Sequence, residues 1–314
     1  MVAALAIAPP AAEAQQARRL YRIGVLTEAW AANHPAVEGL RAGLRDLGLE
    51  EGRDVIFEIR FTKGNRDELW GKAAELVAQS VDLIFTSGDI AVQAAYNASE
   101  KIPIVFTQVG DTLIHRLPQI GHNVKEIITG VSSLNIKLGP KRLEVLKTVA
   151  PAVRRVWMIY PAFDASALAA LQEAQEAAPR LKLEIVSRPV FTAEDVDRAL
   201  SAVGPGDALL APDNDSLDIP SATLEASLRS RIPAIFPTAL WVAHGGLVSY
   251  GPGYYAQGVQ AARLVAKILR GARPQDLPVE GADKIDLAVN LKTATLLGVK
   301  VPRKVLLRAD TLQR

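Results

Sequence analysis

The chain has 314 residues, of which 49% are hydrophobic and 22% are charged, and its formal net charge is +2. A chain of this length and apolar content is predicted to form two globular domains rather than one, and it is not a disordered protein. Its Lys and Arg residues are scattered, which argues against nucleic acid as a partner. The sequence has no Cys, which excludes disulfides, thiol nucleophiles and lipid attachment through an N-terminal Cys.

Residues 1–14 have the features of a signal-peptide remnant. Residues 1–8 are apolar, and Ala12, Glu13 and Ala14 form an A-x-A-like cleavage pattern. The basic segment that opens a signal peptide is missing, so we expect the true start to lie upstream; a disordered Ala-rich tail is the alternative. No later stretch is apolar for long enough to span a bilayer. We therefore expect export to the periplasm.

The first part of the chain alternates between short β-branched runs and amphipathic helices. Apolar runs of four to seven residues predict strands, and runs with a helical period predict helices. The expected strands are residues 21–26, 55–61, 81–86 and 102–106, and the expected helices are residues 35–47, 66–79 and 90–98. This order is typical of a doubly wound parallel sheet.

The same alternation starts again after a link at residues 130–134. The expected strands are residues 153–160, 183–186, 208–211, 232–236 and 247–250, and the expected helices are residues 140–149, 166–178, 193–203 and 221–230. The last stretch begins with a helix over residues 254–269 and exceeds what a second domain needs. We expect it to cross back and brace the first domain.

The predicted fold class is α/β, with two Rossmann-like, doubly wound lobes joined by a multi-strand hinge. The first lobe is expected to comprise residues 21–129 and about 252–281, and the second residues 130–250 and about 282–314. Such sheets bind ligands beyond the carboxyl ends of their strands, so two facing lobes would form a cleft that closes by a hinge motion. Hinge segments are expected near residues 129–132, 249–251 and 281–284.

The sequence contains no recognisable catalytic motif. It has no phosphate-binding loop, zinc-protease helix or nucleophile elbow, and its four His residues lack metal-ligand spacing. Residues 251–256 fit a dinucleotide-binding pattern, but Pro252 and two Tyr residues would crowd a pyrophosphate, so we interpret this segment as a turn and hinge. We therefore predict a protein that is not an enzyme and that needs no cofactor or metal.

Small polar side chains gather in the loops that follow the predicted strands. Hydroxyls and backbone N–H groups at helix N-termini suit a carboxylate or another anion, and Asp213 and Asp215 suit an ammonium group or hydroxyl donors. Trp30 and Trp241 interrupt such loops and would hold an aromatic or apolar body between them. Asp89 fits a helix N-cap as well as it fits a ligand contact. The loops are residues 27–30, 87–89, 107–111, 160–164 (which include Phe163), 212–215 and 238–241.

Short segments along nearly the whole chain match, in order, those of a known protein family. They are residues 21–26, 34–35, 81–84, 94–95, 102–107, 130–132, 212–214, 232–236, 249–251, 254–255, 258 and 289–292. Together they resemble the ABC-transporter substrate-binding proteins that include tryptophan- and tyrosine-binding lipoproteins. The alternative is a ligand-sensing domain of the same fold that feeds a signalling receptor.

The resemblance implies a type I periplasmic-binding-protein fold, a small-molecule solute, an ABC permease and its ATPase as partners, and no cofactor. We expect a monomer, free in the periplasm because no lipid-anchoring Cys is present. The loops at residues 161–166 and 238–241 are more apolar than is usual in the family, so an amino acid, an aromatic acid and another small carboxylate all remain open as solutes. By position, the resemblance implies ligand contacts from Thr27, Glu28, Ser87, Gly88, Thr107, Asp111, Tyr160, Asp213, Asn214 and Thr238.

Overall fold

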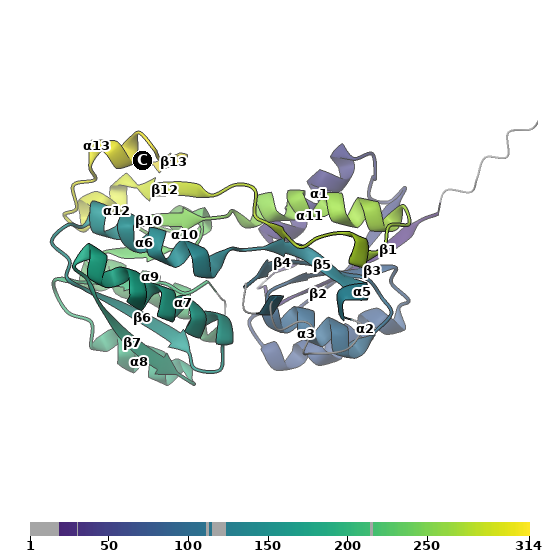
Figure 1. Cartoon of the computed structure of the whole chain (residues 1–314), viewed down its shortest axis with the longest axis horizontal. Coiled ribbons are helices and arrows are strands. Elements are labelled where there is room, and N and C mark those ends of the chain that lie inside the picture. Colours follow the sequence, from purple (N-terminus) through teal and green to yellow (C-terminus); the bar gives the residue numbers. More distant parts are fainter. Residues whose placement is uncertain (1–18, 30, 111–112, 115–123, 214–215) are drawn as a thin grey trace, which may run out of the picture.

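The computed structural model describes residues 19–29, 31–110, 113–114, 124–213 and 216–314. Two separate sheets, each flanked by helices, form two lobes that lie side by side, and chain segments cross between them along one side (Figure 1). The predicted α/β class with two doubly wound lobes is confirmed. Among the described residues, no helix has both the length and the apolar character that a membrane span requires.

The first lobe is built on a six-stranded sheet in the order β11-β5-β4-β3-β1-β2, and every pair of neighbouring strands is parallel. Its strands are β1 (Tyr21–Thr27), β2 (Val55–Phe61), β3 (Leu83–Ser87), β4 (Ile104–Val109), β5 (Ile128–Ser132) and β11 (Glu280–Gly281). Its helices are α1 (Pro35–Asp46), α2 (Leu69–Ala78), α3 (Asp89–Ala98), α5 (Val124–Ile127) and α11 (Tyr254–Leu269).

The second lobe is built on a seven-stranded sheet in the order β13-β12-β10-β9-β8-β6-β7, in which only the β10–β12 pair is antiparallel among the described residues. Its strands are β6 (Arg155–Pro161), β7 (Glu184–Val190), β8 (Asp207–Leu210), β9 (Ala234–Phe236), β10 (Val248–Gly251), β12 (Asp286–Asn290) and β13 (Thr311–Gln313). Its helices are α6 (Asn135–Val149), α7 (Ala165–Ala177), α8 (Ala193–Ser201), α9 (Ile219–Ser230), α10 (Ala239–Ala243), α12 (Leu291–Leu296) and α13 (Arg303–Leu306).

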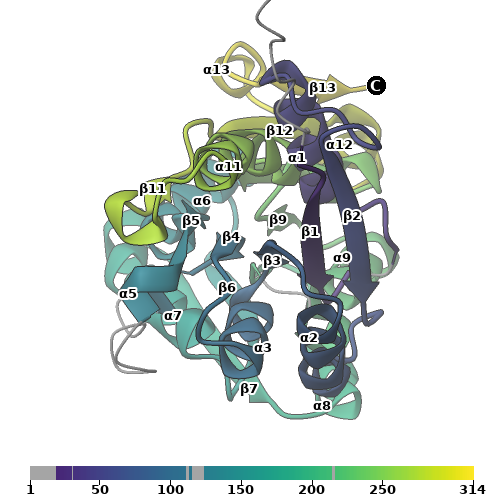
Figure 2. The same ribbon diagram turned by 90° about the vertical axis from the view of Figure 1, so that its right-hand side faces the viewer.

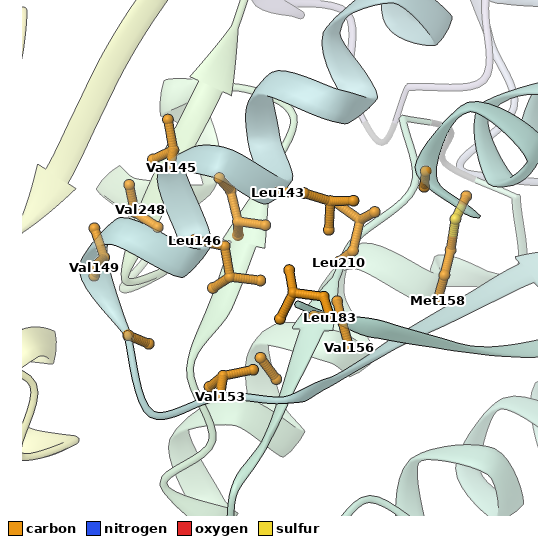
Figure 3. Packing of buried hydrophobic residues seen from close by; sticks show 14 of the residues in the cluster. Leu143, Val145, Leu146, Val149, Val153, Val156, Met158, Leu183, Leu210 and Val248 are labelled. Carbon is orange, nitrogen blue, oxygen red and sulfur yellow. The ribbon is translucent and has the colours of Figure 1, made fainter. Parts of the chain in front are cut away.

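The central strands of each sheet are buried on both faces, which explains why they read as continuous apolar runs. On β1, Ile23 and Val25 pack with α1 and α11, whereas Leu26 points to the opposite face and packs with α2 and α3. Figure 2 shows these two helix layers above and below the first sheet. In the second lobe, Leu143 and Leu146 of α6 pack against the sheet in the same way (Figure 3).

Helix α11 follows the crossing after β10 and packs closely on α1 of the first lobe. A Cβ atom added at Gly258 of α11 would lie 2.0 Å from the carbonyl oxygen of Ala36, and one added at Gly39 of α1 would lie 2.0 Å from that of Tyr255. Only Gly allows two helix backbones to approach this closely. The contact fixes α11 to the first lobe.

Two segments differ from the sequence-based expectation. Residues 130–134 were expected to link the lobes, but residues 128–132 form β5 within the first sheet, so this sheet continues past residue 129. Helix α6 begins at Asn135 rather than at Pro140, which lies inside the helix. The chain crosses between the lobes after β5, after β10 and after β11, close to the three predicted hinge segments.

Candidate functional site

The two sheets share one strand order, and this order fixes the place of the site. The order is β2-β1-β3-β4-β5 in the first lobe and β7-β6-β8-β9-β10 in the second. In both, successive strands are added on opposite sides of the first, so the order reverses between β1 and β3 and between β6 and β8. Ligands of such sheets bind in the crevice beyond the carboxyl ends of the strands at this reversal.

Three hydroxyl side chains form a row across the carboxyl ends of three neighbouring strands in the first lobe. Thr27 of β1 is paired in register with Ser87 of β3, which is paired with Thr107 of β4. All three residues are buried, and the Thr27 hydroxyl accepts a hydrogen bond from the N–H of Ala29 at 3.1 Å. Residues paired in register on parallel strands point to the same face, so the three hydroxyls lie side by side.

Asp89 connects the two lobes directly. It begins α3 in the first lobe, and its carboxylate accepts a hydrogen bond from the Gly110 N–H at 2.9 Å. Its other oxygen accepts a hydrogen bond from the hydroxyl of Ser166 on α7 in the second lobe at 2.8 Å. Asp164 caps α7 by accepting from the N–H groups of Ser166 and Ala167 at 2.7 and 3.0 Å. The N-termini of α3 and α7 therefore face one another.

A second contact between the lobes lies at the outer rim of this region. The guanidinium of Arg66, in the short 3-10 helix that precedes α2, lies over the ring of Phe163 at 4.0 Å from its centroid. Phe163 follows β6, and 39% of it remains exposed. Cation–π contacts of this kind contribute about 0.5–1 kcal/mol at exposed sites.

A buried polar network joins Asp213 to the segments where the chain crosses between the lobes. The hydroxyls of Ser133 and Tyr254 hydrogen-bond to the Asp213 carboxylate, and the charge of Arg142 is close to it. Arg142 is 3% exposed, and its Nε donates to the carbonyl oxygen of Tyr250 at 2.8 Å. Because Ser133 follows β5 and Tyr254 begins α11, Asp213 holds two crossing segments at once.

Burial changes the protonation of these carboxyl groups. It raises the pKa of Asp89 from 3.8 to about 7, and the negative charges of Asp164 and Asp213 act in the same direction. Burial also raises the pKa of Asp213, although Arg142 opposes this effect. A positively charged group between Asp89 and Asp213 would favour the ionised form of both.

Asp213 and Ser166 also line a cavity of about 20 Å³ in the second lobe, together with Arg142, Met158 and Leu210. This volume holds one water molecule and is too small for an organic solute. Within the described part of the chain, no group of three or more His, Asp or Glu side chains could hold a metal ion.

Comparison with known proteins identifies the family. The family model described as "ABC transporter substrate binding protein" matches residues 29–313. The chain belongs to this family. The resemblance noted in the sequence is therefore confirmed, and the two-lobed architecture is that of a substrate binding protein.

Individual relatives of this substrate binding protein cover most of its length. It is 27% identical over 279 residues to a protein named "Tyrosine-binding protein" from Clostridioides difficile (strain R20291), a match that covers 85% of this chain and 79% of the relative. A conserved domain protein from Vibrio cholerae O1 biovar El Tor has 28% identity and a TM-score of 0.82, over 94% of this chain and all of that one. The ABC domain of a Streptococcus pneumoniae protein in complex with L-Trp shares the fold with a TM-score of 0.82 at 22% identity, over 94% of this chain and all of that one.

Most of the predicted ligand contacts that the structure describes lie at the carboxyl ends of strands. Glu28 and Gly88 adjoin the hydroxyl row: a Cβ atom at Gly88 would lie 3.9 Å from the Glu28 Oε1 atom. Thr238 is buried at the start of α10. Tyr160 is largely buried and packs into the hydrophobic core of the second lobe. Trp30, Asp111 and Asn214 lie outside the described residues.

Trp241 lies within α10, and its ring packs into the second lobe rather than at the end of a strand. Its ring is stacked on Phe236 with the ring centroids 6.0 Å apart, and it packs against the second-lobe cluster that contains α8 and α9. Its neighbour Leu240 instead packs against the core cluster of the first lobe. Leu240 is thus the α10 side chain that meets the other lobe.

Sequence reasoning did not single out Gly110, Arg142 or Ser166 as site residues. Gly110 and Ser166 stand within or beside loops that were recognised, and the strand-end position was the available signal. Arg142 lies inside a helix, where nothing in the local pattern separates it from a surface Arg. Only the folded chain brings it to Asp213.

Proposed function

We propose that this protein binds an L-amino acid between its lobes in the periplasm and delivers it, as a monomer, to the permease and ATPase of an ABC importer. Membership of the substrate binding protein family supports the general role. The named tyrosine-binding relative and the structure in complex with L-Trp support an amino acid as the solute. Aromatic acids and other small carboxylates are the alternatives that the experiment below separates.

The observation that carries the proposal is that hydroxyl and carboxylate side chains gather at the strand ends where the two lobes face each other. The first lobe presents the hydroxyl row of Thr27, Ser87 and Thr107, which suits a carboxylate. Asp89 and Asp213 lie where a positive charge would be favourable, which suits an ammonium group. An α-amino acid carries both groups. Glu28, Gly88, Tyr160, Phe163 and Thr238 complete the proposed contacts, with Trp30, Asp111 and Asn214 retained from the sequence. Trp241 is left out because its ring stacks on Phe236.

In the proposed mechanism, the solute binds to one lobe of the open form and then makes contacts with the other lobe. Those second contacts exist only in the closed form, so they shift the equilibrium toward it by their differential free energy. The solute leaves unchanged, since no step converts it.

Titration calorimetry with L-tyrosine, L-tryptophan and their deaminated carboxylates tests the proposal. We expect the amino acids to bind and the deaminated analogues to bind at least about tenfold more weakly, because a buried carboxylate then lacks its partner. Ser87→Ala should weaken binding about tenfold, whereas Ser201→Ala, an exposed position on α8, should have no effect. Equal binding of both solute classes would contradict the amino-acid assignment, and no binding of any of them would contradict the proposed solutes altogether.

A further inference from the structure

The backbone of Gly110 in the first lobe lies directly against the side chain of Ser166 in the second lobe. A Cβ atom added at Gly110 would lie 2.5 Å from the Ser166 hydroxyl oxygen and 2.8 Å from its Cβ. Gly110 follows β4 in the first lobe, and Ser166 lies in the first turn of α7 in the second. The absence of a side chain at position 110 therefore allows the lobes to come this close.

The Ser166 side chain has little freedom to move away from this contact. Its hydroxyl donates to Asp89 at 2.8 Å, and its own N–H donates to the capping carboxylate of Asp164 at 2.7 Å. Its Cβ is fixed by the helix backbone and would remain in contact whichever rotamer the hydroxyl adopts. Gly110 is held in turn, because its N–H donates to the same Asp89 carboxylate.

We propose that Asp89, Gly110 and Ser166 form a latch that holds the two lobes closed, and that the bare backbone of Gly110 is the steric condition for closure. The inference rests on the proposed solute-binding function, since it concerns how the same cleft closes. The latch consists of protein groups alone, so it populates the closed form before a solute has bound. The charged groups around it are Glu28, Asp164 and Asp213, with Arg142 behind Asp213.

The test measures the distance between the lobes in the unliganded protein by pulsed electron paramagnetic resonance. Because the chain has no Cys, spin labels can be attached at two introduced positions, Ala74→Cys on α2 and Asp197→Cys on α8. Both positions are exposed, and Figure 1 shows α2 and α8 on the side of the molecule away from the crossing segments, where opening moves the lobes furthest apart. Spectra are recorded at pH 5.5, at which Asp89 is protonated in the closed form.

A double-mutant cycle separates the latch from a general disturbance of the fold. Gly110→Ala should reduce the ratio of closed to open protein about tenfold, because the lobes cannot approach without displacing Ser166. Ser166→Gly removes both atoms that the new Cβ would meet and leaves Asp89 Oδ2 at 3.7 Å as its next neighbour. In that background Gly110→Ala should cause no further loss. The control is Gly139→Ala in α6, where an added Cβ meets only the Ala170 carbonyl oxygen at 3.7 Å, and no change is expected.

The latch is refuted if the unliganded parent has no closed population, if Gly110→Ala leaves the distances unchanged, or if it lowers the closed population equally in both backgrounds. These results do not depend on any solute. Failure of the proposed function would show instead as a parent protein whose distances do not respond to L-tyrosine or L-tryptophan while the cycle behaves as described.

Discussion

Replacing Asp89 by Asn should remove most of the pH dependence of lobe closure. Burial in the closed form raises the Asp89 pKa from 3.8 to about 7, whereas an open cleft would return the carboxyl group to water and to its ordinary value. Between these two values the closed form binds the proton and the open form does not, so falling pH favours closure. This rise in the Asp89 pKa corresponds to at most about 4 kcal/mol, which opposes closure of the unliganded protein above pH 7.

The expected change can be worked through for the distance measurement with labels at positions 74 and 197. Between pH 8 and pH 5 the ratio of closed to open protein should rise by up to about a hundredfold. Asn keeps both hydrogen bonds, because its oxygen accepts from the Gly110 N–H and its amide donates to the Ser166 hydroxyl. Asp89→Asn should therefore close at pH 8 as readily as the parent does at pH 5.

Two results would refute this reasoning. One is a parent protein with the same closed population at pH 5 and pH 8, which would mean that Asp89 titrates alike in both forms. The other is an Asp89→Asn variant that retains the full pH dependence. Asp213 is the other carboxyl group of the candidate site whose pKa is raised by burial, so Asp213→Asn serves as the comparison that assigns any remaining dependence.

Two substitutions, Gly258→Ala and Trp241→Ala, test packing within the lobes. Gly258→Ala should destabilise the protein by about 1–3 kcal/mol, because the added Cβ would lie 2.0 Å from the Ala36 carbonyl oxygen. The control is Gly71→Ala on α2, whose Cβ meets nothing within 4 Å and which should stabilise the protein by up to about 1 kcal/mol. Urea unfolding measures both free energies, and equal effects would contradict the packing argument. Trp241→Ala should lower the thermal midpoint of the unliganded protein, because the loss of the stack on Phe236 reduces the free energy of unfolding by about 3 kcal/mol. An unchanged midpoint together with weakened solute binding would instead place the ring against the solute.

Much of the fold follows from local patterns in the sequence. The strand at residues 55–61 and the helix at residues 254–269 were predicted with the bounds that the structure has. Both have unambiguous ends, a two-residue alternation in one case and a Gly-bounded amphipathic run in the other. The same patterns repeat in the second lobe, which is why two similar sheets could be expected.

Strand β5 shows where local patterns fail. Its sequence contains Gly130, a residue that weakens strands, and it was interpreted as a link. In the folded chain a Cβ atom at Gly130 would lie 2.4 Å from the carbonyl oxygen of Phe106, because β4 changes register between Phe106 and Val109. The Gly accommodates an irregularity in the neighbouring strand. A pattern within residues 128–132 carries no information about that neighbour.

The candidate site, like the fold, can be predicted from the sequence only in part. Thr27, Ser87 and Thr107 could be predicted because parallel strands bring their carboxyl ends to one edge, and the register then aligns the hydroxyls. The contacts of Ser166 with Gly110 and Asp89 could not, since they depend on the angle between the lobes. That angle is set by the crossing segments and by residues such as Arg142 and Tyr254, which are distant in sequence from what they hold.

The charge on Asp89 should determine both the pH dependence of closure and the choice of solute. Above pH 7 the unliganded protein must bury an ionised Asp89 near Asp164 and Asp213, at a cost that the hydrogen bonds from Gly110 and Ser166 offset only in part. A positive charge in the cleft would offset the remainder. An ammonium group supplies that charge, so L-tryptophan should close the labelled protein at pH 8, whereas its deaminated analogue should close it only at acidic pH. In Asp89→Asn this difference between the two solutes should largely disappear. If the analogue closed the parent equally well at pH 8, the carboxyl groups would have no part in selecting the solute.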